Sequence, residues 1–384
     1  MATSQSAATA SRDWAGVKKF AGLLDPAADV VALGGHRGMG ANVWHPTSST
    51  PIPAPYRENT LKSFQRAVEC GASFLEFDVQ VTRDGVPVIW HDNYVVYGDE
   101  GCPTSSLVAE LTLEEFRQLA PINAGLAPGA AGGDGADTPL LGSSPTASTA
   151  SLASLASLDT ACTASSASSR RLLRKHRNRE PAVAHEPTLR AWACEQEDQF
   201  PMLAEVFASI PPHVAFDIEI KMATPDDLAV TAPAEVDRMV SATLAAVDAG
   251  LAAHGPRLVM FSSFDPDVCL AVKRRRPQAP VMFLSGGGVY VHADPRRTSI
   301  AAAVDFAAAA SLQGVILDTL ALQAAEGGGA RWVEAARERG LRVMTYGLPN
   351  DDPEWVRRQW YLGVQGVIVD DVAGVAAALS AALG

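Results

Sequence analysis

The stretch Phe74-Leu-Glu-Phe-Asp-Val-Gln-Val-Thr-Arg-Asp-Gly-Val-Pro-Val-Ile-Trp-His-Asp92 holds two β-like runs on either side of Asp84-Gly85. Asp-Gly between two such runs is a strong short-range signal for a β-hairpin, because a type I′ turn needs positive φ at both central residues. The stretch therefore predicts a strand that turns back on itself, with polar residues alternating among apolar ones.

The register of this hairpin decides which side chains become neighbours. If Asp84-Gly85 are the central residues, Asp78 pairs with His91 across the two strands. Glu76 shares the face of Asp78, since side chains alternate along a strand. The turn thus predicts two carboxylates and an imidazole at one end of a sheet. A three-residue bulged turn is the alternative, and it would shift the pairing by one residue.

The rest of the chain alternates short β-like runs with helical patterns, which is typical of a parallel α/β architecture. Asn59 is expected to cap the helix that Gly71 ends. Nine strands are expected, one more than a (β/α)₈ TIM-type barrel holds, so one should be peripheral. The expected strands are 30–35, 74–79, 86–90, 214–220, 257–262, 280–284, 313–317, 341–346 and 366–369.

One segment interrupts this alternation. Residues 123–169 are mostly Ala, Ser, Gly, Thr and Pro, and the basic run 170–179 follows. Such a composition buries too little apolar surface to offset the entropy of ordering. We interpret 122–198 as a low-complexity, disordered insertion in one catalytic barrel of residues 29–375, with a flexible N-terminus at 1–28 and a C-terminal helix end at 376–384. The basic run is either a solvated flank of the insertion or a regulatory or anionic-membrane contact.

Charged and apolar residues alternate in Phe216-Asp-Ile-Glu-Ile-Lys-Met222. Asp217, Glu219 and Lys221 should therefore share one face of a strand. Charges on a half-exposed strand would simply face water. A central strand of a parallel sheet is covered on both faces, however, and inward charges there are costly unless they are paired or bind a metal ion. We favour a functional cluster.

A third cluster, Gly34-Gly-His-Arg-Gly38, follows the first expected strand. The carboxyl ends of barrel strands are where active sites lie. With the other clusters, His36 and Arg37 complete a set of three carboxylates, two histidines, one Arg and one Lys. Carboxylates of this kind suit Mg²⁺, Ca²⁺ or Mn²⁺, histidines suit general acid–base catalysis, and Arg and Lys suit a phosphoryl group. The set predicts phosphodiester cleavage.

The composition of the chain limits the partners and compartments that we expect for it. The net charge of −12 in 384 residues argues against a broad nucleic-acid surface. Five scattered cysteines favour a reducing compartment over a disulfide framework, and no apolar run approaches the ~18–20 residues of a membrane helix. The Ala/Ser/Thr-rich start Met1–Arg12 is compatible with a transit peptide or with a disordered terminus. We expect an intracellular protein, with cytoplasm and plastid both open, and the oligomeric state is not predicted.

These motifs resemble the glycerophosphodiester phosphodiesterase family, whose fold is the barrel shared with phosphatidylinositol-specific phospholipases C. The loop from Met39 to Arg57 is similar to that of the plant and fungal branch. Tyr346 and Asp217 depart from the family pattern, and the insertion has no counterpart in it. The matching motifs are His36-Arg-Gly38, Glu58-Asn-Thr60, Glu76-Phe-Asp-Val79, Thr82-Arg-Asp-Gly-Val-Pro-Val88, His91-Asp92 and Glu219-Ile-Lys221, with weaker matches at Pro201–Glu205, Phe261–Phe264, Thr345–Gly347 and Gly366–Asp370.

The resemblance implies hydrolysis of small glycerophosphodiesters, such as glycerophosphocholine or glycerophosphoethanolamine, to sn-glycerol 3-phosphate and an alcohol. It implies one divalent cation, Mg²⁺ or Ca²⁺, bound by Glu76, Asp78 and Glu219. His36 and His91 would be the catalytic acid–base pair. Arg37 and Lys221 would bind the substrate phosphate.

Two alternatives remain. A lysophospholipase D or phospholipase C acting on lipid headgroups would need an apolar entrance, which the loop 39–57 could form with Val43, Trp44, Ile52 and Tyr56. A catalytically silent binding barrel would usually have lost a metal carboxylate or a histidine, and all of them are present here.

Overall fold

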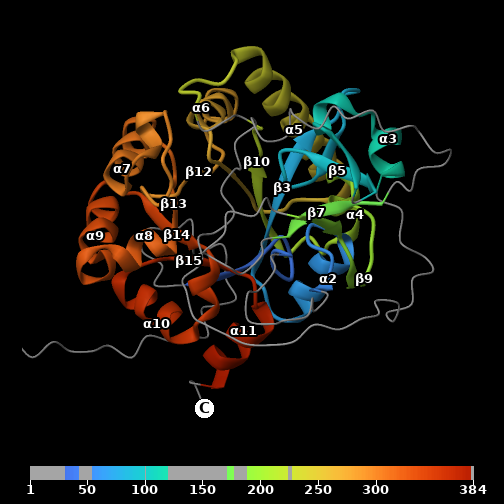
Figure 1. Cartoon of the computed structure of the whole chain (residues 1–384). Coiled ribbons are helices and arrows are strands. Elements are labelled where there is room, and N and C mark those ends of the chain that lie inside the picture. The colour runs from blue at the N-terminus through green and yellow to red at the C-terminus, as the bar shows by residue number, and fades with distance from the viewer. Residues whose placement is uncertain are drawn as a thin grey trace, which may run out of the picture.

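Eight parallel strands close into a barrel in the computed structural model, which describes residues 31–42, 54–99, 101–119, 171–176, 188–223 and 227–381. The strand order is β1-β15-β14-β13-β12-β11-β10-β3, and pairing of β1 with β3 closes the ring (Figure 1). This confirms the (β/α)₈ TIM-type barrel. The strands are β1 (Ala32–His36), β3 (Phe74–Val81), β10 (Ala215–Ile220), β11 (Val259–Ser263), β12 (Val281–Ser285), β13 (Gly314–Asp318), β14 (Arg342–Tyr346) and β15 (Gly366–Val369).

The ninth expected strand is β4 (Pro87–Ile89), which pairs antiparallel with β3 on the outside of the ring. All nine expected strands exist, and the peripheral one is the second strand of the hairpin.

The hairpin register differs from the type I′ prediction. Gln80 pairs with Val88, one residue away from the predicted alignment, and the loop holds three residues, Arg83-Asp84-Gly85. Gly85 has φ 81°, whereas Asp84 does not have positive φ. The prediction that Asp78 and His91 pair directly is therefore wrong. The bulged alternative holds because only one residue of the loop takes the left-handed conformation.

Gly85 offers a test of this turn. Replacing Gly85 with Ala should lower the free energy of unfolding by about 1 kcal/mol, because a Cβ disfavours positive φ. No atom lies within 4 Å of the added methyl group, so no steric clash contributes to the loss in the free energy of unfolding. The matched control is Gly101→Ala, at a glycine with equally open surroundings and no positive φ. Urea denaturation of both variants would measure the difference, and equal stabilities would contradict the turn geometry.

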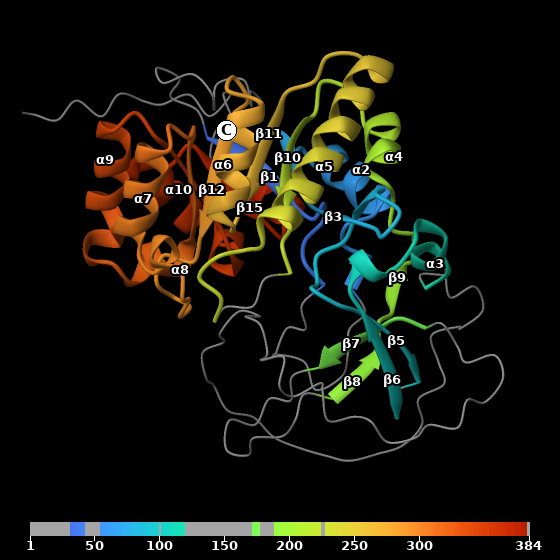
Figure 2. The same cartoon turned by 90° about the horizontal axis from the view of Figure 1, so that it is seen from above.

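Helices cover the outside of the barrel (Figures 1 and 2). The main core lies between the helices and the outward faces of the strands, and a second cluster, including Phe74, Met260 and Ile316, fills the interior of the ring. The helices are α2 (Leu61–Glu69), α3 (Leu113–Gln118), α4 (Leu203–Ser209), α5 (Pro233–His254), α6 (Pro266–Arg275), α7 (Ile300–Ala309), α8 (Thr319–Ala324), α9 (Ala330–Glu338), α10 (Pro353–Leu362) and α11 (Val372–Ala381).

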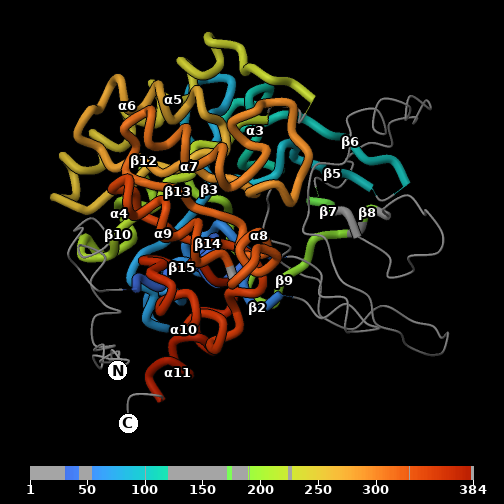
Figure 3. Tube along the Cα trace, turned by 90° about the vertical axis from the view of Figure 1, so that its left-hand side faces the viewer, coloured from blue at the N-terminus to red at the C-terminus, as the bar shows by residue number. Residues whose placement is uncertain are grey.

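The predicted insertion is partly an ordered element of the domain. Within 122–198, residues 171–176 and 188–198 are described, and they contain β7 (Leu173–His176), β8 (Thr188–Ala191) and β9 (Cys194–Gln196). β7 and β8 lie near the hairpin of β5 (Val95–Asp99) and β6 (Cys102–Ser106) in Figures 2 and 3. The expectation of disorder does not hold for these stretches. The rest of 122–198, and residues 1–28, lie outside the described residues.

This side of the molecule has its own small core. Leu172 and Trp192 from the insertion pack there with Trp90 and Phe116, and Trp90 and Trp192 have ring centroids 5.9 Å apart. Burial of these aromatic rings stabilises the packing of the described parts of the insertion against the barrel. The solvated-flank interpretation of the basic run is therefore wrong at its Leu172–Arg174 portion.

Two further expectations change. Thr60, not Asn59, is the N-cap of α2, because its hydroxyl accepts from the amide of Ser63. Cys102 is disulfide-bonded, whereas Cys70, Cys194 and Cys269 are free. This bond runs against the expectation that the scattered cysteines favour a reducing compartment over a disulfide framework. None of the described helices combines the length and apolar character needed to cross a bilayer.

Candidate active site

Three carboxylates converge at the carboxyl ends of β3 and β10. The parallel register places Glu219 beside Asp78, and Glu76 lies beside His36 of β1. Glu76, Asp78 and Glu219 each offer an oxygen, and these oxygens all lie within 4.8 Å of one another. The side chains are buried. The structure therefore brings together the three acids that the sequence analysis assigned to a metal ion.

The electrostatics of this cluster favour a bound cation. Burial, followed by repulsion from Asp78 and Glu219, raises the pKa of Glu76 well above its usual range. Burial also raises the pKa of Glu219, although Lys221 opposes this shift. Oδ1 of Asp78 is buried and makes no hydrogen bond with the described residues. Three crowded oxygen donors with an unsatisfied oxygen among them fit a hard divalent cation such as Mg²⁺ or Ca²⁺.

Two cationic side chains border the carboxylates. Nζ of Lys221 lies 3.0 Å from Oε1 of Glu219 and 3.4 Å from Oδ1 of Asp78. Nε of Arg37 lies 3.4 Å from Oδ2 of Asp78, and its backbone amide donates to Glu76 at 2.9 Å. Arg37 adopts φ 49°, a left-handed conformation that non-glycine residues rarely adopt. Such backbone strain often accompanies functional sites.

Each predicted catalytic histidine has a carboxylate at Nδ1. Nδ1 of His36 lies 2.7 Å from Oδ1 of Asp370, and Nδ1 of His91 lies 2.8 Å from Oδ1 of Asp92. An ionised carboxylate only accepts, so Nδ1 donates and Nε2 of each ring is left for proton transfer. Burial, and then the charges of Arg37 and others nearby, lowers the pKa of His91 well below its usual range.

Sequence reasoning had assigned no role in the site to several residues that surround it. Asn59 donates from Nδ2 to Oδ2 of Asp78 at 2.8 Å, and it adopts φ 58°. Glu58 accepts from Nη1 of Arg37 at 3.0 Å. Asp370 orients His36, and burial would raise its pKa, but the imidazole outweighs burial and lowers it. The family motifs Glu58-Asn-Thr60 and Gly366–Asp370 were the available signal for these residues.

Asp217 is the register neighbour of Glu76 across β10 and β3. It is fully buried, and neither of its carboxylate oxygens makes a hydrogen bond with the described residues. Burial raises the pKa of Asp217 to about 8. The nearby Ser262 opposes this shift, although its hydroxyl is not in hydrogen-bonding geometry. Asp217 is the residue where this chain departs from the family pattern.

Replacing Asp217 with Asn should stabilise the chelator-treated protein at pH 7 by on the order of 4 kcal/mol. The unfolded carboxyl ionises near pH 4, whereas the folded one holds its proton up to about pH 8. The wild type therefore loses stability as the pH rises between these values, and the Asn variant does not. Urea denaturation at pH 4 and pH 7 would measure this. A variant that is no more stable than wild type at pH 7 would contradict the burial of an unpaired carboxyl.

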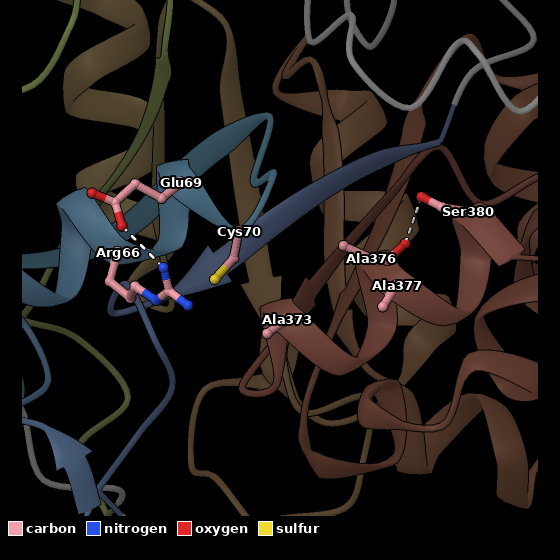
Figure 4. Close-up of a pocket in the computed structure, with 7 residues that line it drawn as sticks. All are labelled: Arg66, Glu69, Cys70, Ala373, Ala376, Ala377 and Ser380. Atoms are coloured by element: carbon pink, nitrogen blue, oxygen red, sulfur yellow. Dashed lines mark hydrogen bonds and ion pairs between the residues drawn. The ribbon is translucent and has the colours of Figure 1, made fainter.

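A separate hollow lies between α2 and α11 (Figure 4). Arg66 and Glu69 form an ion pair at its edge, and the α11 side is lined by small residues. No predicted site residue lines this hollow, so it does not contribute to the chemistry of the carboxylate cluster.

Known proteins with similar sequences are named as phosphodiesterases that act on glycerophosphodiesters. The model of the glycerophosphoryl diester phosphodiesterase family matches residues 36–373. A chloroplastic glycerophosphodiester phosphodiesterase of Arabidopsis thaliana is 30% identical over 90% of this chain and 79% of the relative. A glycerophosphocholine phosphodiesterase of Eremothecium gossypii is 31% identical over 89% of this chain, which spans only 25% of that relative.

The fold agrees with solved structures. A phosphodiesterase of Oleispira antarctica, solved with the product sn-glycerol-3-phosphate, superposes with a TM-score of 0.54. The two proteins are 15% identical, and the match covers 92% of this chain and 99% of that one. This likeness concerns the barrel alone. Together with the family match over residues 36–373, it leads to one conclusion. The chain belongs to the glycerophosphoryl diester phosphodiesterase family, a family of phosphoric diester hydrolases.

Proposed function

We propose that this protein hydrolyses small glycerophosphodiesters to sn-glycerol 3-phosphate and a free alcohol with the help of one divalent cation. The observation that carries the proposal is the convergence of Glu76, Asp78 and Glu219 within 4.8 Å, bordered by Arg37 and Lys221. Buried acids in such a cluster repel one another, and a bound cation would relieve this repulsion, which supports a cation-binding site.

The three carboxylates would hold Mg²⁺ or Ca²⁺, which supplies positive charge to polarise the phosphoryl group. Arg37 and Lys221 add two fixed positive charges at the same place. In the transition state they match the negative charge that builds on the phosphoryl oxygens. Because both side chains already face the carboxylates, little reorganisation is needed when the phosphate arrives.

His36 and His91 supply proton transfer. One imidazole removes a proton from the attacking hydroxyl through Nε2, and the other donates a proton to the oxygen of the leaving alcohol. Asp370 and Asp92 hold the two rings by their Nδ1 atoms and select the tautomer. The low pKa of His91 leaves its ring neutral near pH 7, so it is able to accept a proton.

The proposal is tested with purified full-length protein and a panel of glycerophosphodiesters carrying choline, ethanolamine or glycerol headgroups. Release of sn-glycerol 3-phosphate is measured in Mg²⁺ and Ca²⁺ in parallel, before and after chelation. We expect activity that chelation abolishes and one of the two ions restores. Absence of cation-dependent release from every substrate would overturn the proposal and favour a silent binding barrel.

A second candidate, hydrolysis of monoacylated lipid headgroups, is favoured by a different observation. Leu228, Val230, Val289 and Val291 are exposed on the loops that follow β10 and β12, and parts of these loops line a common hollow. Loops after barrel strands surround the active-site mouth, so these side chains could contact an acyl chain. From the loop 39–57, Val43, Trp44 and Ile52 lie outside the described residues.

Comparing glycerophosphocholine with lysophosphatidylcholine below its micellar concentration separates the two candidates. A higher kcat/KM for the monoacylated substrate, lost on changing Val230 and Val291 to Ser, would establish the lipid activity. A preference for the deacylated substrate that these changes do not alter would exclude it.

A further inference from the structure

We propose that Arg174, which the insertion contributes, is a positioning residue that aligns Arg37 through Glu58 and His91 through Asp92. This inference rests on the proposed function, because Arg37 and His91 are the groups that it would align. Arg174 comes from the basic run that the sequence analysis had taken for a solvated flank or a remote contact.

The contacts of Arg174 are those of a buried anchor. Its two Nη atoms donate to the two carboxylate oxygens of Glu58 at 3.0 and 2.8 Å, a bidentate pair. Nη1 also donates to the carbonyl of Asn42 at 3.0 Å, and the guanidinium carbon lies 4.2 Å from the ring centroid of Trp192. The side chain is 19% exposed. The bidentate pair with Glu58, the bond to the Asn42 carbonyl and the stacking on the Trp192 ring together fix the orientation of the guanidinium.

Two residues of the site depend on the partners of this guanidinium. Glu58, which is 1% exposed at its side chain, also binds Nη1 of Arg37 at 3.0 Å. Oδ1 of Asp92 lies 3.6 Å from Nη2 of Arg174 and 2.8 Å from Nδ1 of His91. One side chain therefore contacts both carboxylates that orient a phosphate-binding group and an acid–base group.

Two guanidinium groups stabilise the ionised form of Glu58. Burial by itself would raise its pKa, but Arg174 and then Arg37 outweigh burial and hold it below the usual range. Without Arg174, the buried carboxylate of Glu58 would keep only Arg37 as a charged partner, beside the backbone amide of Asn42, and the geometry of the Glu58–Arg37 pair would relax. Asn59, the next residue, binds Asp78, so a shift of Glu58 would also reach the carboxylate cluster.

The insertion delivers Arg174 through a fixed backbone. Leu172 and Leu173, just before it, are 5% and 4% exposed. The carbonyl of Leu172 accepts from the amide of Trp192 at 2.9 Å, and the carbonyl of Arg171 accepts from the amide of Gly98 at 2.9 Å. Arg174 itself pairs with Arg190 in the β7–β8 ladder. These apolar and backbone contacts fix the backbone at Arg174 independently of the contacts that its guanidinium makes with the site.

The test is Arg174→Gln in the full chain, assayed on glycerophosphocholine with the restoring cation. We expect kcat to fall about 10- to 100-fold with a smaller change in KM, because misalignment of catalytic groups acts mainly on the transition state. Arg174→Lys should recover little, since an ammonium cannot make the fork. Guanidinium ion at millimolar concentration should partly restore Arg174→Ala, a rescue that a general loss of stability would not show.

The matched control is Arg57→Gln. Arg57 is buried, stacks on the same Trp192 ring at 4.8 Å and pairs with Glu197, but it contacts none of the carboxylates that orient the site. We expect it to lower the melting temperature about as much as Arg174→Gln while leaving kcat near that of wild type. A double-mutant cycle of Arg174→Gln with Glu58→Gln should show losses well below additive, since both act through one contact.

Several outcomes would overturn the inference: a kcat of Arg174→Gln within about twofold of wild type, an equal loss in Arg57→Gln, or additive losses in the cycle. If wild type itself hydrolyses no glycerophosphodiester, the proposed function fails first. Calorimetric binding of sn-glycerol 3-phosphate to wild type and Arg174→Gln then decides the inference. Equal affinities would reject it, and weaker binding by the variant would support the alignment of Arg37.

Discussion

Replacing Glu219 with Gln should reduce turnover by about 10²-fold or more, because it removes one of three charged oxygen donors from the carboxylate cluster. The substitution keeps the size of the side chain and changes only its charge. Steady-state rates over a range of Mg²⁺ and Ca²⁺ concentrations would show the loss, and excess cation should recover only part of it.

A second signature separates loss of the cation from loss of the fold. Burial, and then repulsion from Asp78 and Glu219, raises the pKa of Glu76, so removing the charge of Glu219 should raise the melting temperature of the chelated protein. Wild type should gain stability on adding the cation, because a ligand bound only by the folded state stabilises it. The variant should gain much less.

Glu205→Gln is the matched control for this experiment. Glu205 lies in α4, pairs with Arg117 and is 38% exposed at its side chain, away from the carboxylate cluster. Its loss should alter neither turnover nor cation-dependent stabilisation. If Glu219→Gln retained a near-normal rate and the full cation response, Glu219 would not be a ligand, and the metal-dependent mechanism would lose its main support.

Replacing His36 or His91 with Ala should each reduce hydrolysis of glycerophosphocholine by about 10²- to 10⁴-fold, the usual contribution of general acid–base catalysis. The choice of substrate then distinguishes the two roles. When the substrate is a p-nitrophenyl ester of glycerol phosphate, the leaving group is p-nitrophenolate, which departs without protonation. The variant that lacks the general acid should therefore regain most of its rate with this ester. The variant that lacks the base should be slow with both substrates.

His213→Ala serves as the control, because His213 is exposed just before β10 and lies at the opposite end of that strand from Glu219. Both substrates should be cleaved at wild-type rates by this variant. A histidine whose removal leaves the rate with glycerophosphocholine unchanged does not belong to the acid–base pair. Equal losses with both esters in both variants would mean that neither imidazole protonates the leaving oxygen.

Periodicity was enough to predict a parallel α/β architecture and the inward acids, and the family resemblance implied that the sheet closes into a barrel. Alternation along β10 indicated that Asp217 and Glu219 share a face, and the carboxyl ends of parallel strands meet at one rim. The hairpin was predicted correctly, but its register was not. A two-residue and a three-residue turn both suit Asp84-Gly85, and the choice depends on how β4 packs outside the ring.

Composition was misleading for the insertion. Residues 123–169 dominate its average, so the two leucines before Arg174 carried little weight. In the structure both leucines are buried, and Leu172 packs in the cluster that contains Trp192, so burial orders the chain there. Asn59 illustrates the same limit. Its sequence position is that of a helix cap, yet its amide binds Asp78 and Thr60 caps the helix.

The sequence alone determined that this protein is a parallel α/β protein with acids, histidines and cations at the ends of its strands, because backbone periodicity and strand polarity are local properties. Only the tertiary structure decided which side chains hold these groups in place. Asp370 meets His36 across 334 positions of the chain, and Arg174 meets Glu58 across 116. Such pairs form because the ring closes and the insertion docks, and no local pattern records either event.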